Sequence, residues 1–299
     1  MGIPPPLPGE SASGFVIRLS RFLSVDLSRP LRGMIGDPLA SASAVHRSEL
    51  IEFLADFSGL PRTSFEPLFA LPQSPGQSVK LGDFIVRAAH IDQSRRRVSP
   101  ALYASDVEAG RPLYHRLTWS LAHLKEDPDT GHPLIDTCDR CRASLRWSVA
   151  FDVGQCDVCT RRLWISPSGP SAKPNVLDKV LQDLFSSSVH ARVSARSALP
   201  ARIRTWPEGD ILDLLHVIES FGAAVAIKLD VDACLGRSNT EYAVLSGEDA
   251  IRRVVRAPIE AALKKKDRMS PIAASGVTIA YLRRSPSKAV SDYLLSLVA

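Results

Sequence analysis

Two CxxC pairs constrain this sequence more than any other feature. They contain four of the five cysteines in the 299-residue chain, namely Cys138, Cys141, Cys156 and Cys159. Each CxxC places two sulfurs on one tight turn, and two such turns supply the four thiolates that a tetrahedral zinc ion binds at about 2.3 Å. The spacing therefore predicts a small zinc-ribbon or treble-clef-like module that folds around one Zn²⁺.

Such a zinc ion is structural, because protein ligands fill all four positions and leave none for water or substrate. The main alternative, a redox-active CxxC, needs a βαβ context that the sequence lacks. Arginines crowd the cysteines and suggest a DNA-binding patch. They equally offset the formal charge of about −2 on a zinc ion with four thiolates. These arginines are Arg140, Arg142, Arg146, Arg161 and Arg162.

The composition, 45% apolar, supports a core without disulfides and predicts two or three packed units. The N-terminus lacks the basic start and apolar run of a signal peptide, and no apolar run approaches eighteen residues. We therefore expect a cytoplasmic protein with reduced thiols and no membrane partner. A formal net charge of +5 favours a polyanionic partner, although ordinary basic proteins share it.

Apolar residues at helical spacing predict a first helix over 13–27. The stretch 47–71 then has the outline of a helix-turn-helix, with a break at Gly59 to Pro61 and a second helix capped by Thr63 or Ser64. That outline suits DNA-groove binding, but ordinary helical cores are built in the same way.

The sequence predicts a mainly α fold, in which helical domains that contain a helix-turn-helix flank the zinc module. We place an N-terminal helical domain at 1–98 and the zinc-ribbon region at 99–165. A Ser-, Pro- and Gly-rich linker follows at 166–174. Amphipathic helices then predict a C-terminal helical domain at 175–299, and one of them should close at Gly222.

Sequence signatures of catalysis are missing. The chain has no GxxxxGK[ST] phosphate loop, no GxGxxG turn and no HExxH helix. Its acidic residues and histidines are dispersed. We therefore expect a protein that is not an enzyme, unless a site assembles from residues far apart in the sequence.

The segment PLPGES and the segment YHRLTW, the latter followed by the two CxxC pairs, together resemble the TniQ family, the target-selection proteins of certain bacterial transposons. PLPGES at 6–11 leads into a helix with Arg18, as the family's opening Pro-x-x-Gly-Glu-Ser stretch does. YHRLTW at 114–119 and the CxxC pairs follow the family's tandem zinc region. The resemblance spans roughly the first 165 residues.

The sequence departs from this family where a first zinc ion would bind. The positions of its four ligands are taken by Ser99, Leu102, Asp127 and Thr130. The resemblance therefore implies that one of two zinc sites has been lost. We expect apolar packing to replace the roughly 10–16 kcal/mol that a structural zinc contributes. The residues expected to supply this packing are Leu102, Leu117, Trp119 and Leu121.

The resemblance implies a non-enzymatic adaptor for transposition. Such a protein links a target, either DNA or a CRISPR RNA-guided effector complex, to an AAA+ ATPase that recruits the transposase. Two basic runs are candidate contacts to phosphate backbone or guide RNA, or solvated helix ends. They consist of Arg95, Arg96 and Arg97, and of Lys264, Lys265 and Lys266. The sequence leaves undecided whether the chain forms a homodimer, because it has no heptad repeat that would predict a coiled-coil dimer interface.

Two other functions compete with the adaptor. A stand-alone transcriptional regulator would use the helix-turn-helix at 47–71 to bind one DNA sequence without an ATPase. A hydrolase or nuclease is disfavoured by the closed zinc site.

Overall fold

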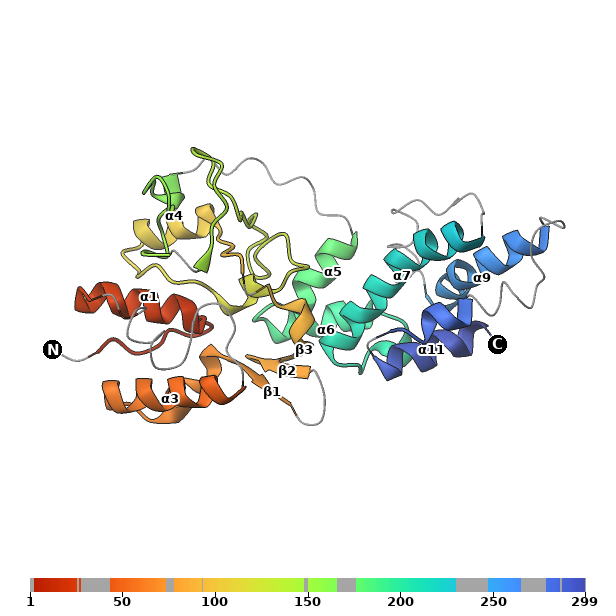
Figure 1. The fold of residues 1–299 in the computed structure, drawn as a ribbon, viewed down its shortest axis with the longest axis horizontal. Coiled ribbons are helices and arrows are strands. Elements are labelled where there is room, and N and C mark those ends of the chain that lie inside the picture. The colour runs from red at the N-terminus through yellow and green to blue at the C-terminus, as the bar shows by residue number, and fades with distance from the viewer. Residues whose placement is uncertain are drawn as a thin grey trace. The chain divides into compact units, whose positions relative to one another are not determined.

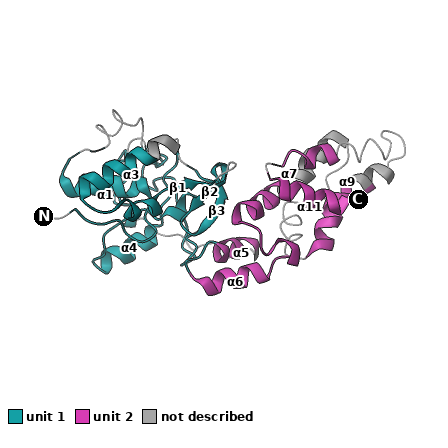
Figure 2. Ribbon diagram, turned by 90° about the horizontal axis from the view of Figure 1, so that it is seen from below, with its two compact units in different colours: residues 1–174, 185–187 teal, residues 175–184, 188–299 magenta. Residues whose placement is uncertain are grey.

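The computed structural model describes residues 3–25, 27, 44–73, 78–92, 94–147, 150–165, 176–229, 247–264, 278–285 and 287–298. About half of the structure is helical, with one small three-stranded sheet (Figure 1), which confirms the mainly α class in its coarse form. The chain divides into two compact units, unit 1 (1–174 and 185–187) and unit 2 (175–184 and 188–299) (Figure 2). The linker predicted at 166–174 lies outside the described residues.

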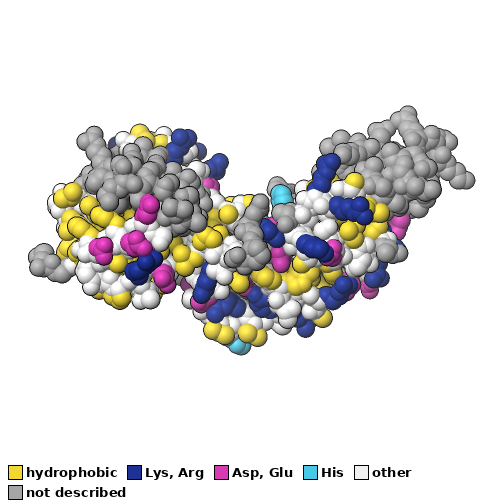
Figure 3. All heavy atoms as spheres, turned by 60° about the horizontal axis from the view of Figure 1, so that its bottom comes forward, with side chains coloured by type: hydrophobic (Ala, Val, Ile, Leu, Met, Phe, Trp, Pro, Cys, Tyr) yellow, Lys and Arg dark blue, Asp and Glu magenta, His cyan; other side chains and the backbone are white. Residues whose placement is uncertain are grey.

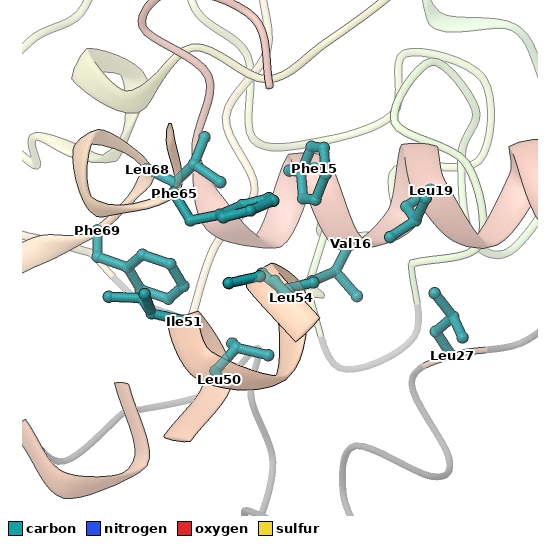
Figure 4. Packing of buried hydrophobic residues seen from close by; sticks show 11 residues of the cluster. Phe15, Val16, Leu19, Leu27, Leu50, Ile51, Leu54, Phe65, Leu68 and Phe69 are labelled. Carbon is teal, nitrogen blue, oxygen red and sulfur yellow. The ribbon is translucent and has the colours of Figure 1, made fainter. Parts of the chain in front are cut away.

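Helices α1 (Ala12–Leu23) and α3 (Ala44–Ser58) build the first core of unit 1. Helix α1 begins where the Ser11 hydroxyl accepts a hydrogen bond from the Gly14 amide, and it ends at Ser24, which is left-handed. It therefore ends four residues earlier than predicted. Apolar side chains of α1, α3 and the segment after α3 meet in one cluster (Figure 4), which includes Phe15, Val16, Leu19, Leu50, Ile51, Leu54, Phe65 and Phe69.

The second helix of the predicted helix-turn-helix does not form. Its residues make two 3₁₀ turns, η1 (Arg62–Ser64) and η2 (Glu66–Leu68). Pro67 has no amide hydrogen to donate, and its ring disfavours helical backbone at Glu66. Phe65 instead packs edge-on against Phe15 at 5.7 Å, so this stretch completes the core. The helix-turn-helix predicted at 47–71 is therefore corrected to a helix followed by turns.

A three-stranded antiparallel sheet follows these turns and was not predicted. Strands β1 (Ala70–Pro72), β2 (Ser78–Leu81) and β3 (Phe84–Arg87) lie in the order β1-β2-β3. Gly82, with φ +61°, makes the tight turn between β2 and β3. Alternate side chains of these two strands are buried, as expected when one face of a sheet covers a core.

The rest of unit 1 is mostly irregular backbone around a second core. Its described residues form one α-helix, α4 (Pro100–Glu108), which Ser99 caps, and include the 3₁₀ turns η3 (Ala88–His90), η4 (Leu117–Ser120) and η6 (Leu163–Ile165). Isolated β-bridges tie distant segments together, for example Val98 with Ile135. The buried side chains of this core include Val98, Tyr103, Trp119, Leu145 and Leu163, together with Cys138 and Cys156.

Unit 2 is helical throughout its described part. Helix α5 (Val176–Leu184) packs on α6 (Val189–Ser197), and α7 (Glu208–Leu229), α9 (Glu248–Lys264) and α11 (Lys288–Val298) pack against one another. Helix α7 was expected to close at Gly222 but continues to Leu229, because the alanines after Gly222 favour helix. Within the described ranges, no helix is both long and apolar enough to cross a membrane.

Candidate metal centre

Each CxxC pair sits on a loop with the same backbone hydrogen bonds. In the 138 knuckle (138–143), the Cys138 amide donates to the Ala143 carbonyl and the Arg142 amide donates to the Cys138 carbonyl, both at 2.9 Å. In the 156 knuckle (156–161), the Cys156 amide donates to Arg161 at 2.9 Å and the Thr160 amide donates to Cys156 at 3.0 Å. These bonds turn both thiols of a pair to one side of the loop.

Both knuckles hold a non-glycine residue in the left-handed region. Arg142 has φ +60° and Thr160 has φ +55°. Left-handed backbone costs a residue with a Cβ roughly 1–2 kcal/mol, so it persists only where the surroundings enforce it. The gathering of the four thiols at this point is a physical reason for the strain.

The four sulfurs have the spacing of a tetrahedral zinc site. All four Sγ atoms lie within 4.8 Å of one another. The Sγ atoms of Cys138 and Cys159 are 3.7 Å apart, and those of Cys141 and Cys156 are 3.6 Å apart. Zinc–sulfur bonds of about 2.3 Å in a regular tetrahedron put the sulfurs about 3.8 Å apart. The predicted ligand set is thus brought together in a geometry that fits a metal ion such as zinc.

The thiols need a cation to ionise together. At Cys141, a backbone hydrogen bond with Ala143 lowers the thiol pKa, but desolvation and hydrogen bonds to the other three thiols raise it to about 12. Four thiolates this close repel one another, and a divalent cation reverses that balance. Within the described residues, this is the one group of three or more His, Cys, Asp or Glu side chains placed to hold a metal.

A third loop repeats the knuckle backbone without any cysteine. In the 127 knuckle (127–132), the Asp127 amide donates to the His132 carbonyl at 2.8 Å and the Gly131 amide donates to the Asp127 carbonyl at 2.9 Å. Gly131, with φ +71°, takes the left-handed position. A β-bridge flanks each of the three knuckles at equivalent residues, namely Glu126 with Pro133, Thr137 with Ser144, and Gln155 with Arg162.

Hydrogen bonds to a buried carboxylate hold the 127 knuckle in shape. The Asp127 carboxylate is 1% exposed. It accepts hydrogen bonds from the Trp119 indole at 2.8 Å and from the amide and hydroxyl of Thr130 at 3.0 and 2.8 Å. The expected apolar packing is also present, since Leu102, Leu117, Trp119 and Leu121 are all buried. The hydrogen bonds of Asp127 were not predicted, although Asp127, Thr130 and Gly131 in DPDTG repeat the knuckle spacing.

Arg96 was a candidate nucleic-acid contact, and the structure corrects this. Its side chain is fully buried. The guanidinium donates to the carbonyls of Asp152, Val153 and Gln155 and to the carboxylate of Asp157, at 2.6 to 3.1 Å. Arg96 therefore holds the loop that forms the 156 knuckle, and it has no surface to offer to phosphate.

Arg97 needs the same correction. Its guanidinium is buried and donates to the Leu124 carbonyl at 2.6 Å and to the Leu121 carbonyl. It thereby supports the segment that leads into the 127 knuckle. Of this basic run, only Arg95 is exposed, and it pairs with Asp136 at 2.9 Å. Lys265 and Lys266 lie outside the described residues, as does the side chain of Lys264.

The two segments that carry the family resemblance pair with each other. The Ser11 amide donates to the His115 carbonyl at 2.8 Å, and the Leu117 amide donates to the Gly9 carbonyl at 2.7 Å. The buried Glu10 carboxylate accepts two hydrogen bonds from Arg18, at 2.8 and 2.7 Å. PLPGES and YHRLTW are thus paired through their backbones.

Comparison with known proteins adds no assignment. A scan against protein-family models finds no match to the chain, and a search of curated proteins finds no significant match.

Proposed function

We propose that the chain is a cytoplasmic, non-enzymatic adaptor for transposition target selection. It links a DNA target or a CRISPR RNA-guided complex to an AAA+ ATPase, and through the ATPase to a transposase. The observation that carries the proposal is the backbone pairing of residues 9–11 with 115–117, in the same compact unit as the thiol-bearing knuckles. The two segments that resemble the TniQ family are therefore paired with each other within unit 1, and this supports the proposal.

The metal centre supports a structural role in this adaptor. The residues Cys138, Cys141, Cys156 and Cys159 would hold one Zn²⁺ and fill its four positions. When bound, the ion would cross-link the two knuckles, each of which is closed by a short β-bridge of its own. Unit 1 then presents one rigid surface to a partner protein.

The charge distribution supports dependence on a partner. Arg96 and Arg97 point inward, so they add nothing to attraction at the surface. On the face in Figure 3, Lys and Arg side chains are interspersed with acidic and apolar ones. Scattered positive charge gives non-specific attraction to nucleic acid that weakens steeply between about 50 and about 200 mM salt. We therefore expect the chain alone to bind DNA weakly and without sequence specificity at physiological salt.

The test combines a pull-down with a salt series. The purified chain is mixed with the AAA+ ATPase encoded beside it, and its binding to random duplex DNA is measured from about 50 to about 200 mM salt. We expect capture of the ATPase and only weak DNA binding near about 150 mM salt. If the chain instead selected one DNA sequence with nanomolar affinity and ignored the ATPase, the adaptor proposal would be wrong.

A stand-alone DNA-binding regulator is the second candidate, and α5 with α6 favours it. Four residues join these helices in a helix-turn-helix outline, and Val189 and Val193 of α6 are 64% and 61% exposed. Exposed side chains at the start of such a second helix contact base edges, and valine suits thymine methyl groups. In this case Val189→Glu would abolish sequence-specific binding, measured by footprinting, whereas the adaptor would still capture its ATPase.

A further inference from the structure

A cavity of about 280 Å³ lies on unit 1 beside the 156 knuckle. Ile17 and Val153 line it with buried aliphatic carbon, and Leu113 and Trp164 contribute apolar carbon that is partly exposed. Small-molecule sites commonly measure about 300–1,000 Å³. This cavity is below that range, so its size suits one bulky side chain better than a cofactor.

Gly154 keeps this cavity in shape. A Cβ atom at Gly154 would come within 2.6 Å of the Leu113 side chain and 2.7 Å of the Trp164 ring. Both side chains therefore pack directly on the Gly154 backbone. The indole of Trp164 lines one side of the cavity, and the Arg162 guanidinium lies over it, 5.5 Å from the ring centroid.

Two arginines of α1 supply positive charge at the cavity. Arg18 is occupied by Glu10, to which it donates two hydrogen bonds. Arg21 forms an ion pair with Asp152, whose side chain is 3% exposed, while the Arg21 side chain itself is 61% exposed. A guanidinium has five N–H donors in a fork, so Arg21 can hold Asp152 and still donate outward to a second carboxylate.

Exposed apolar side chains adjoin the lining residues in the chain. Phe22 follows Arg21, Phe151 precedes Asp152, and Ile165 follows Trp164, and these side chains are 44%, 79% and 57% exposed. Each of these three segments lines the cavity and also carries a large exposed apolar residue, a combination typical of a protein-binding surface. Arginine and aromatic residues are also enriched where protein partners anchor.

We infer that this cavity is a docking site for a protein segment that carries a bulky apolar side chain beside an aspartate or glutamate. The apolar side chain enters between Ile17, Leu113 and Trp164. The carboxylate binds the outward edge of Arg21. The inference is independent of the adaptor proposal, because it concerns a surface of unit 1 and its test needs no ATPase.

Charge favours this peptide over nucleic acid. A tryptophan beside arginines also suits a stacked base with its phosphate. Here, however, the buried Asp152 lies at the cavity and repels phosphate, and the exposed Phe151 and Ile165 offer no partner to a charged backbone. Asp152 also repels a peptide carboxylate, but this peptide brings one such charge, which the outward edge of Arg21 can bind, whereas a nucleic-acid strand brings a charge at every nucleotide.

The experiment selects a phage-displayed library of random 12-residue peptides on the zinc-loaded full chain. Enriched peptides are then synthesised and their affinity is measured by fluorescence anisotropy. We expect a consensus with Asp or Glu next to Phe, Leu, Ile or Trp. Arg21→Ala should weaken binding roughly tenfold or more, as for an interface hot spot. Pro112→Glu, which adds a like charge at a lining residue that is exposed, should weaken it similarly.

Controls separate docking from folding. Arg21→Lys keeps a cation for Asp152 but loses the forked N–H donors of the guanidinium. This variant should therefore fold normally and yet bind the peptide weakly. Arg62→Ala removes another exposed arginine of unit 1, which neither lines the cavity nor belongs to a knuckle, and should bind peptide like the wild type. The inference is overturned if no acidic-apolar consensus emerges, or if Arg21 and Pro112 variants bind peptide normally. It is also overturned if a 12-nucleotide single strand, and no peptide, binds in a way that depends on Arg21.

Discussion

His115 lies between two indole rings in the second core of unit 1. Its ring centroid is 5.4 Å from that of Trp119 and 4.6 Å from that of Trp147. Burial first, and then the charges of Arg96 and Arg97, lower the pKa of His115 well below its ordinary value of 6.5. The imidazole therefore stays neutral in the folded protein at neutral pH.

We predict that the free energy of unfolding falls as the pH drops below about 6.5. Below this pH the unfolded chain binds a proton at His115 and the folded chain does not, so stability is complete above that pH and is lost below it. The slope for one such group is at most about 1.4 kcal/mol per pH unit. Urea unfolding between pH 7.5 and pH 5.5 should show a flatter dependence for His115→Asn than for the wild type. Parallel slopes would contradict this, since zinc release in acid acts on both proteins.

Arg96 gives a second prediction at the residue scale. Arg96→Ala removes the guanidinium that donates to three carbonyls and to the buried Asp157 carboxylate. Removing one partner of a buried charge pair costs about 3–5 kcal/mol, and we expect that loss in urea unfolding. Its neighbour Arg95 is 61% exposed, and Arg95→Ala should cost at most about 1 kcal/mol. Similar losses for both variants would show that Arg96 does not hold the 156 knuckle.

At the scale of the element, α1 approaches the segment of His115 through a glycine. A Cβ atom added at Gly14 would lie 2.9 Å from the Cβ and 3.2 Å from the amide nitrogen of His115. Glycine inside a helix is normally less stable than alanine by roughly 0.5–1 kcal/mol. At Gly14 this contact with rigid backbone makes alanine less stabilising than glycine, the reverse of the usual order.

We therefore predict that Gly14→Ala destabilises the protein by about 1–3 kcal/mol, the usual cost of overpacking. Ser13→Ala, at the preceding position of the same helix, should be neutral or slightly stabilising. Thermal unfolding of both variants measures the difference. A Gly14→Ala protein as stable as the wild type would mean that α1 shifts without cost.

The elements that the sequence predicts are those with local causes. The Ser11 cap and the apolar spacing of α3 lie within one helix, and each CxxC within one loop, so the helices and the ligand set follow from short stretches. Strands of three or four residues carry almost no such signal. The hint that was available was the Gly82–Asp83 turn between alternating apolar residues.

The roles of the arginines could not be predicted, because their partners are distant in the chain. Arg96 binds carbonyls 56 to 59 residues away, and Arg97 binds carbonyls 24 and 27 residues away. A run of basic residues suggests a solvated surface until those contacts are known. Consecutive side chains on extended backbone point to opposite sides, and this lets Arg96 and Arg97 serve different loops.

At the scale of the whole molecule, we predict one zinc ion per chain. Elemental analysis of the purified protein should give one metal, and Cys141→Ser should lose it and unfold the knuckles. Cys234 lies outside the described residues, and Cys234→Ser should keep its zinc. Two metals per chain, or none, would overturn the assignment of the ligands.

The two units should also respond differently to metal removal. Unit 2 has its own core, which includes Ile211, Leu214, Ile251 and Leu294, and its helices do not contribute to the thiol cluster. We predict that a chelator removes hydrogen-exchange protection from 94–165 while α7 and α11 stay protected. Joint loss of protection would mean that the chain unfolds as one cooperative body.

The 127 knuckle keeps its structure without zinc and without thiols. Thiolate ligands tie a loop to the supply of zinc and expose it to oxidants. A loop of the same shape that is held by the Asp127 carboxylate and the Trp119 indole contains no group that peroxide or zinc starvation attacks at the concentrations that damage a thiol. In a cell under oxidative stress, the 138 and 156 knuckles would therefore open first, and the segment around Asp127 would keep its form.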